Sequence, residues 1–309
     1  MKKISIVIPA HNEEGNLPVI QERIKNVFQS LPQYIYEIIF VNDGSTDHTQ
    51  EVIEELSSQN QEVRYIEFSR NFGHQPAVKA GIDNAYGDAV ISMDADLQHP
   101  PELIPELLKK WEEGYEMVYT IRKYTDETSY FKKMTSDLFY MILSKLSDFK
   151  LEKGSGADFR LLDASVVKVI REMSEHEIFL RGTAKWVGFN QVGVSFQAFD
   201  RLTGESKYNM IKMLKFAFTG ITAFSIKPLY IAAYLGFFFS LFAVLFYTVY
   251  VVWAFVDGSP ISGWASLIMT VVFFGGLQLT MLGVIGVYLG KAFKELKGRP
   301  NYIIRRKNF

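Results

Sequence analysis

Two aspartates separated by one small residue follow a short apolar segment in the first third of the chain. Residues 89–93 read Ala-Val-Ile-Ser-Met, and Asp94, Ala95 and Asp96 come directly after them, with Gln98 two positions further on. Two carboxylates that lie close together need a cation or water between them. With Gln98 as a further oxygen donor, the set suits Mg²⁺ or Mn²⁺, which keep coordination positions open for substrate phosphates. The spacing therefore predicts a divalent metal site, although such a triplet is also common by chance.

Alternating strand and helix patterns must position these carboxylates. Apolar, mostly β-branched runs predict strands at residues 4–8, 37–41, 63–68, 89–93 and 117–121. Helix-period apolar residues predict helices at 16–31, 47–56, 75–85 and 101–113. This order is typical of an α/β fold with a parallel sheet and crossover helices. Open sheets of this kind bind ligands beyond the carboxyl ends of their strands.

Three of the predicted strand exits are unusually polar, at residues 9–13, 42–47 and 94–100. If the three strands are parallel and adjacent, their acidic side chains converge on one rim of the sheet. A single acid in such a place can instead be a helix N-cap. That reading is favoured for Asp47 and stays open for Asp43.

Composition excludes several classes of protein. The chain has 33 basic and 34 acidic residues, so its overall charge gives no reason to expect a nucleic-acid partner. It has no cysteine, which excludes thiolate metal sites and cysteine nucleophiles. No glycine-rich phosphate loop follows a predicted strand and no HExxH pattern occurs, which argues against NAD and ATP-hydrolase functions. Diphosphate binding must then depend on a metal with basic side chains such as Arg122, Arg201 and Lys207, each of which is also compatible with a solvated surface charge.

Two long uncharged runs, residues 228–256 and 258–290, flank Asp257. Each is longer than the roughly 20 residues that cross a bilayer, so we predict transmembrane helices at 228–256 and 264–290. A pair of very hydrophobic core helices is the alternative. Gly286 and Gly290 form a GxxxG pattern, which favours close packing on the first span and also allows a homo-oligomer through the transmembrane helices.

Basic residues gather at both outer ends of the apolar region, at positions 212, 215 and 227 before it and 291, 294, 297, 299, 305, 306 and 307 after it. The positive-inside rule then places both termini in the cytoplasm, at the plasma membrane. We therefore expect a cytoplasmic catalytic domain at 1–207, an interfacial amphipathic segment at 208–227 and a basic cytoplasmic tail at 291–309 after the spans. The amphipathic segment also fits a buried core helix.

Seven ordered motifs resemble one known family over nearly the whole chain. They read IVIPAHNEE, VNDGSTD, FSRNFG, DADLQHPPE, GSGADFRLLD, FLRGTAKWVGF and RLTGESKY. They resemble family 2 glycosyltransferases of GT-A fold, in the polyisoprenyl-phosphate branch that includes bactoprenol glucosyltransferases and dolichol-phosphate mannose synthases. The QxxRW motif of processive relatives is absent.

The resemblance implies roles for individual residues. The nucleotide sugar would be bound by Pro9, His11, Glu13, Val41, Asp43, Asp94 and Ala95, and the metal by Asp94, Asp96 and Gln98. Many relatives have tyrosine at position 11. His11 therefore leaves open whether the donor's nucleoside is uridine or guanosine, and its alternative role is that of a stacking or packing residue. The histidines at 48, 74, 99 and 176 lack ligand spacing, and we treat them as surface or loop residues.

The resemblance assigns catalysis to Asp158 as base and to Arg122, Arg201 and Lys207 as phosphate contacts. A phosphate monoester with a second pKa near about 6 is already largely an anionic nucleophile, so Asp158 has little proton to remove and mainly orients the acceptor. The alternative is a structural ion pair between Asp158 and Arg160.

The function that follows is inverting transfer of one hexose from a nucleotide sugar, most simply UDP-glucose, to undecaprenyl or dolichyl phosphate. GDP-mannose and UDP-GlcNAc remain alternative donors, and a protein, glycan or diacylglycerol remains an alternative acceptor. The competing hypothesis, from another class of protein, is a non-catalytic membrane scaffold that binds a nucleotide. The intact acidic motifs argue against it.

Overall fold

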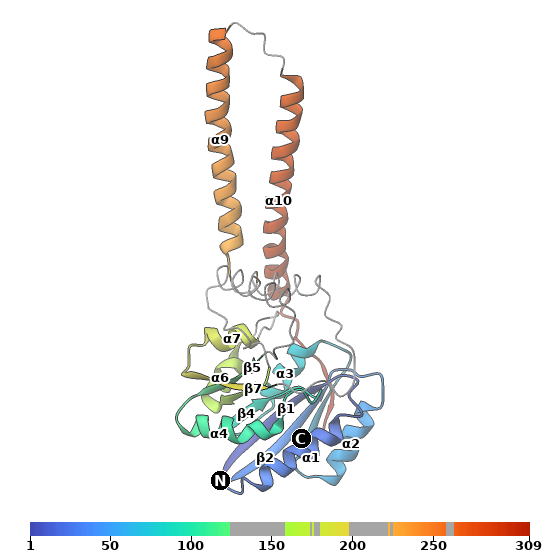
Figure 1. Ribbon diagram of the computed structural model, residues 1–309. Helices are drawn as coiled ribbons and strands as arrows, with labels where there is room; N and C mark the ends of the chain where they lie inside the picture. Colours follow the sequence, from blue (N-terminus) through green and yellow to red (C-terminus); the bar gives the residue numbers. More distant parts are fainter. Residues whose placement is uncertain (124–157, 174, 176–179, 198–221, 223–224, 258–262) are drawn as a thin grey trace.

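The computed structural model of the protein contains an α/β domain and a hairpin of two long helices that projects from it (Figure 1). The structure describes residues 1–123, 158–173, 175, 180–197, 222, 225–257 and 263–309. The segment 208–227, expected to be amphipathic, lies outside the described residues except for Thr222 and residues 225–227.

The described strands form one mixed sheet in the order β7-β5-β6-β4-β1-β2-β3-β8. Their bounds are β1 Lys2–Ala10, β2 Tyr34–Asn42, β3 Val63–Phe68, β4 Ala89–Ser92, β5 Met117–Lys123, β6 Arg160–Asp163, β7 Gln191–Gln197 and β8 Ile304–Lys307. Strand β1 pairs in parallel with β2 and β4, β2 with β3, and β5 with β7. Strand β6 runs antiparallel between β4 and β5, and β8 runs antiparallel to β3. The expected α/β fold with a mostly parallel sheet is therefore confirmed.

Helices cover both faces of the sheet. They are α1 Leu17–Gln29, α2 Thr49–Gln59, α3 His74–Asp83, α4 Ile104–Glu112 after a 3₁₀ turn at Pro101–Leu103, α6 Ala164–Glu172 and α7 Leu180–Trp186. Successive side chains of a strand point to opposite faces. Accordingly Ile6 packs in one buried cluster with Ile20 of α1, and Val7 packs in the other with Val78 of α3. Two apolar layers thus fix the sheet between its helices.

Helices α9 (Lys227–Asp257) and α10 (Trp264–Leu296) form the hairpin. Their apolar windows, Lys227–Tyr250 and Thr270–Leu296, have mean hydropathies of 2.2 and 1.9, and neither is buried inside the described structure. Both are long and apolar enough to cross a membrane. Helices that contact each other but whose apolar windows are not buried do not fit the core-helix alternative, so the two helices indicate membrane association.

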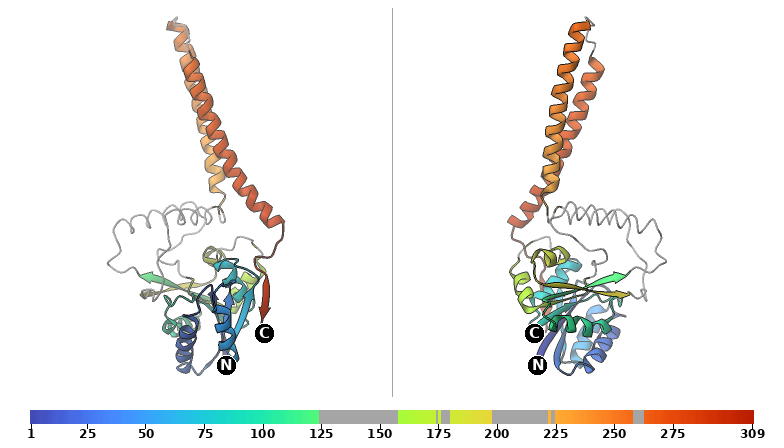
Figure 2. Two further views of the ribbon diagram at one scale, coloured as in Figure 1. Left: turned by 90° about the vertical axis from the view of Figure 1, so that its right-hand side faces the viewer. Right: turned by 60° about the vertical axis from the view of Figure 1, so that its left-hand side comes forward.

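The C-terminal part differs from the expected basic tail at 291–309. Helix α10 continues past Gly290 to Leu296, and residues 304–307 then form β8 at the edge of the sheet. Figure 2 shows the chain running from the base of α10 along the domain to the C-terminus. The sequence pattern missed this strand because a short basic segment at a sheet edge has the composition of a solvated tail.

The glycines of α10 do not pack on α9 as we had favoured. A Cβ atom added at Gly276, Gly283, Gly286 or Gly290 would meet no described atom within 4 Å. Gly236 of α9 is different, because a Cβ there would lie 3.2 Å from the Met281 side chain. The GxxxG pattern of α10 therefore makes no close contact with the described part of α9.

Candidate active site

The Asp94-Ala95-Asp96 turn follows β4 at its carboxyl end. Ala95 and Leu97 are buried, whereas Asp94 and Asp96 are partly exposed. Leu97 has a φ of 60°, a conformation that costs energy for a residue with a branched side chain and that occurs most often at functional sites. The Oδ1 atom of Asp96 accepts the backbone N–H of Gln98 at 3.2 Å. The buried apolar residues therefore anchor a tight turn that presents the two carboxylates.

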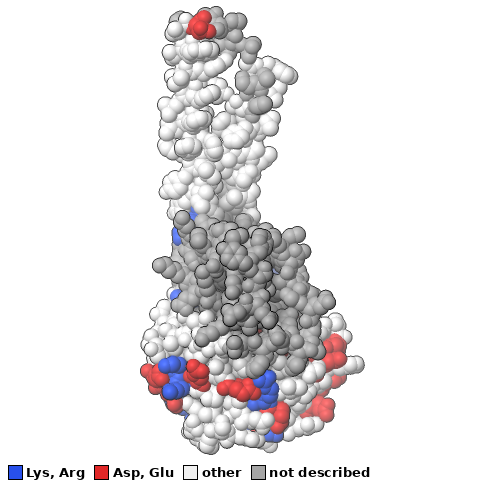
Figure 3. Space-filling model, viewed as in Figure 1, with Lys and Arg blue, Asp and Glu red and all other residues white. Residues whose placement is uncertain are grey.

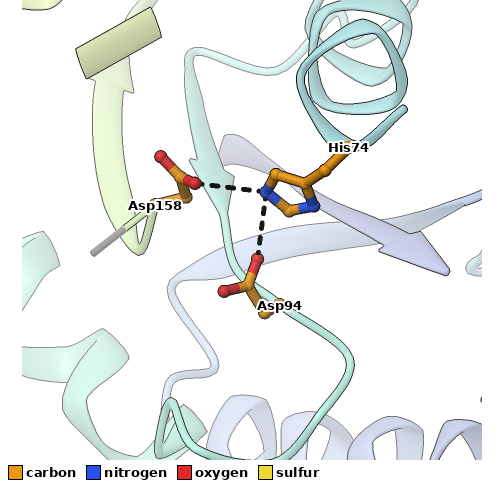
Figure 4. Close-up of side chains that lie close together, drawn as sticks. All are labelled: His74, Asp94 and Asp158. Carbon is orange, nitrogen blue, oxygen red and sulfur yellow. Dashed lines mark hydrogen bonds and ion pairs between the residues drawn. The ribbon is translucent and has the colours of Figure 1, made fainter. Parts of the chain in front are cut away.

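Three side chains from separate elements meet beside this turn (Figure 4). The Nε2 atom of His74, the first residue of α3, lies 3.1 Å from Oδ2 of Asp158 and 3.4 Å from Oδ1 of Asp94. Asp158 lies two residues before β6. The ligand atoms of the three residues all lie within 4.8 Å of one another. This spacing is compatible with a shared metal ion.

Asp158 is buried and held from several sides. Gln75 donates to its Oδ2 through Nε2 at 3.2 Å, and Nη2 of Arg160 lies 3.5 Å from its Oδ1. Ser92 of β4 donates its hydroxyl to the Asp158 carbonyl at 2.6 Å. The ion pair with Arg160 therefore exists, and it coexists with contacts to His74 and Gln75 at the metal-compatible group.

The donor set fits a divalent cation. The Oδ1 atom of Asp94 is buried and has no hydrogen-bond partner among the described residues, although 31 % of the side chain is exposed. Burial raises the pKa of the Asp94 carboxyl, and the Asp158 and Asp96 carboxylates act in the same direction, against His99 and His74. A divalent ion would relieve this crowding of like charge. Asp94, Asp158 and His74 are the residues that would hold it.

Asp43 connects two loops on the same rim. Its carboxylate accepts the backbone N–H of Phe72 at 2.6 Å and of Gly73 at 2.9 Å, and the residue is 3 % exposed. Nδ1–H of His11 donates to the Asp43 carbonyl at 3.0 Å. Both Asp43 carboxylate oxygens thus fix the loop before α3, and Asp43 is not the cap of α2. The N-cap of α2 is His48, which makes no side-chain cap hydrogen bond, so Asp47 is not the N-cap that we favoured; it lies one residue earlier, where its Oδ1 accepts the Thr49 N–H at 3.1 Å.

Of the other residues expected at the site, three are fully described, one is described only in its backbone, and two lie outside the described residues. Pro9 and Val41 are directly paired in the register of β1 and β2, and the Glu13 N–H donates to Thr49 at 2.9 Å. Arg122 lies in β5, but its side chain is not described. Arg201 and Lys207 lie outside the described residues. The carboxyl ends of β1, β2 and β4 are thus neighbours in the sheet, as expected.

Two histidines lie at the candidate site that were not expected there from the sequence. His74 belongs to the metal-compatible group, and His99 is 7 % exposed with Nδ1 accepting the Asp94 N–H at 3.2 Å. The His99 ring packs against Phe159 and Phe196. Both are surface or loop residues as expected, since the His74 side chain is 42 % exposed and His99 lies in the turn after β4, but both also contact Asp94 at the candidate site. The available signal was their place, because His74 follows the polar exit of β3 and His99 closes the turn after β4.

Fold and site together define an α/β transferase with the sheet architecture of the GT-A fold and a polar site at the strand exits. Residues 5–171 match the family Glycosyl transferase family 2. The chain belongs to this family and is a glycosyltransferase, which confirms the resemblance of its motifs.

Three similar proteins illustrate the relationship. The uncharacterized glycosyltransferase YkcC of Bacillus subtilis is 43% identical over 302 residues, which cover 98% of this chain and 93% of the relative. The bactoprenol glucosyl transferase of Shigella phage SfII is 40% identical over 304 residues, covering 98% of each chain. Among solved structures, the mannosyltransferase PcManGT from Pyrobaculum calidifontis in complex with GDP-Man and Mn2+ has a TM-score of 0.47 and 14% identity, covering 96% of this chain and 87% of that one.

Proposed function

We propose that this glycosyltransferase moves one hexose, glucose from UDP-glucose, to the phosphate of a polyprenyl lipid such as undecaprenyl or dolichyl phosphate. The similarity to a bactoprenol glucosyl transferase over 98% of both chains supports this sugar and this class of acceptor. Transfer to a lipid requires an active site at the bilayer surface. The observation that carries the proposal is therefore the placement of the His74, Asp94 and Asp158 group relative to the hairpin.

The candidate site lies on the side of the domain that faces the hairpin. The N-terminus, where β1 begins, lies at the end of the domain away from the hairpin (Figure 1). The carboxyl ends of β1 and of the parallel β4 therefore point toward the hairpin. A lipid phosphate held at the bilayer surface would approach from this side.

The chemistry requires separation of the sugar from a nucleoside diphosphate. A bound Mg²⁺ or Mn²⁺ would neutralise negative charge on the departing diphosphate. A lipid phosphate oxygen forms the new bond to the anomeric carbon while the bond to the diphosphate breaks on the opposite face, which inverts the configuration. Asp158, braced by His74, Gln75 and Arg160, orients the acceptor phosphate.

The remaining contacts are assigned from the family motifs. Pro9, His11, Glu13 and Val41 line the nucleoside side of the rim, and Asp43 holds the loop beside it. Asp96 and Gln98 add oxygen ligands for the metal next to Asp94, with Ala95 against the diphosphate. Arg122, Arg201 and Lys207 contact the donor and acceptor phosphates.

Membrane topology follows from the path of the chain. The chain leaves the domain into α9, returns through α10 and pairs β8 with β3, so two crossings leave the catalytic domain and the C-terminus on one side. The charge pattern supports the cytoplasm as that side, because basic residues lie at the base of the hairpin and an acidic residue at its tip (Figure 3), where α9 ends at Asp257. The membrane is then the plasma membrane. The glycines of α10, which have no described neighbour within 4 Å of an added Cβ, are where a second copy would pack in a homo-oligomer.

A donor panel tests the proposal. Purified full-length protein receives radiolabelled UDP-glucose, GDP-mannose or UDP-GlcNAc, each with undecaprenyl phosphate and Mn²⁺. The expected result is a chloroform-soluble labelled product from UDP-glucose. A product from another donor would keep the reaction and change the sugar, whereas no lipid product from any donor would refute the proposed function and favour a nucleotide-binding scaffold.

A further inference from the structure

The last residues of the chain link the second membrane helix to the catalytic domain. We call residues 301–308 the C-terminal strap. Its strand β8 pairs with β3 through Phe68 with Ile304 and Glu67 with Arg306. The Asn308 side chain oxygen accepts the Tyr65 N–H at 2.8 Å, which extends the attachment along β3. The strap is therefore part of the folded domain.

The strap holds the loop that precedes α3. The Ser69 N–H donates to the Ile303 carbonyl at 3.0 Å, and Nη2 of Arg305 donates to the Ser69 carbonyl at 3.2 Å. The Tyr302 ring stacks on Phe68 with centroids 5.2 Å apart, and Phe68 meets Phe72 edge to face at 5.6 Å. Phe72 is the residue whose N–H bonds to the Asp43 carboxylate.

The strap also holds the other end of α3. The Tyr302 hydroxyl donates to Oδ2 of Asp83, the last residue of α3, at 2.9 Å. The same carboxylate receives Lys79 at its Oδ1. Nζ of Lys307 donates to Oδ1 of Asn84 at 3.2 Å. Helix α3 is thus tied to the strap before its first turn and after its last.

Helix α3 begins with the two residues that hold Asp158. His74 and Gln75 both contact Oδ2 of Asp158, and any rotation or shift of α3 on the sheet would move both. A short helix fixed at its two ends keeps such groups within the few tenths of an ångström that catalysis requires. The strap, which follows α10 in the chain, holds α3 at both of its ends.

We propose that Tyr302 is a positioning residue for the transfer reaction, which sets His74 and Gln75 against Asp158 by holding α3, and that the strap thereby couples the active site to the membrane helix α10. This inference rests on the proposed function for its kinetic readout. Tyr302 acts from the far end of α3 and does not contact the substrate.

The test compares two substitutions on the strap in the full-length protein. Tyr302→Phe keeps the ring stack on Phe68 and removes the hydrogen bond to Asp83. Arg306→Gln is the matched control, because Arg306 pairs with Glu67 and Glu54 and, within the described part of the chain, its side chain forms no hydrogen bond or ion pair with α3 or residues 69–73. Tyr302→Phe should lower kcat about 3- to 10-fold with a less than twofold change in the donor KM, while Arg306→Gln should stay within twofold of wild type in both.

A double-mutant cycle separates positioning from general destabilisation. If Tyr302 acts through His74 and Gln75, Tyr302→Phe should cause no further loss of kcat in a protein that already carries His74→Ala and Gln75→Ala. Full additivity in that background would overturn the proposal. Equal losses for Tyr302→Phe and Arg306→Gln, in step with their unfolding temperatures, would overturn it as well.

Hydrogen–deuterium exchange supplies a readout that needs no turnover. Amides of residues 69–83 should exchange faster in Tyr302→Phe than in wild type or Arg306→Gln, while α1 and α4 remain unchanged. Unchanged exchange in 69–83 would refute the role of the strap. If the wild-type protein transfers no sugar with any donor, the proposed function fails, and the exchange experiment still decides whether the strap fixes α3.

Discussion

His74 Nε2 lies 3.1 Å from Oδ2 of the buried Asp158, so the first residue of α3 contacts the residue that the family motifs mark as catalytic. The same nitrogen lies 3.4 Å from Oδ1 of Asp94. One imidazole therefore connects the acid at the exit of β4 with the acid before β6. This arrangement makes the geometry of the two carboxylates depend on α3 as well as on the sheet.

Replacement of His74 tests this dependence. His74→Ala should lower kcat by about 10²-fold or more, because it removes both a hydrogen bond to Asp158 and a nitrogen that can bind a metal. Steady-state kinetics with the lipid acceptor measure the effect. His48→Ala is the control, since the His48 side chain is 82% exposed at the start of α2. Wild-type kcat in His74→Ala would show that the contact is incidental.

Asp158 can be tested as an orienting group against a general base. Asp158→Asn keeps an oxygen that can accept from Gln75, so we expect it to retain roughly a tenth of the wild-type kcat, whereas Asp158→Ala should lose at least about 10²-fold. The comparison uses initial rates at saturating donor. If both variants fall equally by about 10²- to 10⁴-fold, the reaction needs the negative charge of the carboxylate, as a base or as a metal ligand, and an orienting role alone is wrong.

The central sheet could be predicted from sequence because its signals are local. Buried runs such as residues 4–8 and 37–41 contain enough β-branched residues to predict β1 and β2, and the polar residues after them marked the rim correctly. Strand β8 could not be predicted this way. Its pairing with β3 joins residues more than two hundred positions apart, and its basic composition is also typical of a solvated tail.

The histidines show the same limit at the site. A carboxylate pair such as Asp94 and Asp96 is visible as a spacing, but His74 and Asp158 are separated by 84 positions and meet only because α3 and β6 flank β4. His99 was invisible for a different reason. Its Nδ1 accepts the backbone N–H of Asp94 inside a turn that contains Leu97 at positive φ, and spacing does not encode that.

The ion pair between Arg23 and Glu102 should stabilise the segment after the Asp94-Ala95-Asp96 turn in a pH-dependent manner. The guanidinium of Arg23 on α1 makes two hydrogen bonds, 2.9 and 2.6 Å, to the Glu102 carboxylate in the turn before α4, and the bond from Arg23 lowers the pKa of Glu102. A lowered carboxyl pKa contributes stability above the unfolded pKa of about 4.3 that is lost as pH falls through the folded pKa.

Because Glu102 is largely exposed, solvent screening limits the effect of this pair. Arg23→Gln should lower the free energy of unfolding by about 0.2–1 kcal/mol at pH 7, and the difference from wild type should vanish once Glu102 is protonated in both proteins. Denaturant unfolding measures it at pH 7 and at a pH well below about 4, where Glu102 is protonated in spite of its lowered pKa. A difference that is the same at both pH values would contradict the assignment to Glu102.

Metal binding provides the most direct test of the site, because Asp94 Oδ1 is a buried carboxylate oxygen that lacks a hydrogen-bond partner among the described residues. An oxygen in that state gains more from a cation than an exposed carboxylate does, so Asp94→Asn should weaken Mn²⁺ binding by more than the roughly 10- to 100-fold typical of an outer-shell change. Electron paramagnetic resonance on the full-length protein measures free and bound Mn²⁺. Chelation by EDTA should abolish transfer, and added Mn²⁺ or Mg²⁺ should restore it.

The matched control for this test is Asp47→Asn on the same rim of the sheet. Asp47 accepts the Thr49 N–H at the start of α2, and asparagine serves equally well at such a position, so metal affinity and activity should both remain near wild type. Full Mn²⁺ affinity in Asp94→Asn would remove Asp94 from the metal site. The ligand atoms of His74, Asp94 and Asp158 lie within 4.8 Å of one another, so loss of Asp94 as a ligand would argue against this group as the metal site. The ion would then be expected at Asp96. Asp96→Asn distinguishes a metal held by His74, Asp94 and Asp158 from a metal held at Asp96. Only a metal at Asp96 predicts that Asp96→Asn loses the metal while Asp94→Asn keeps it.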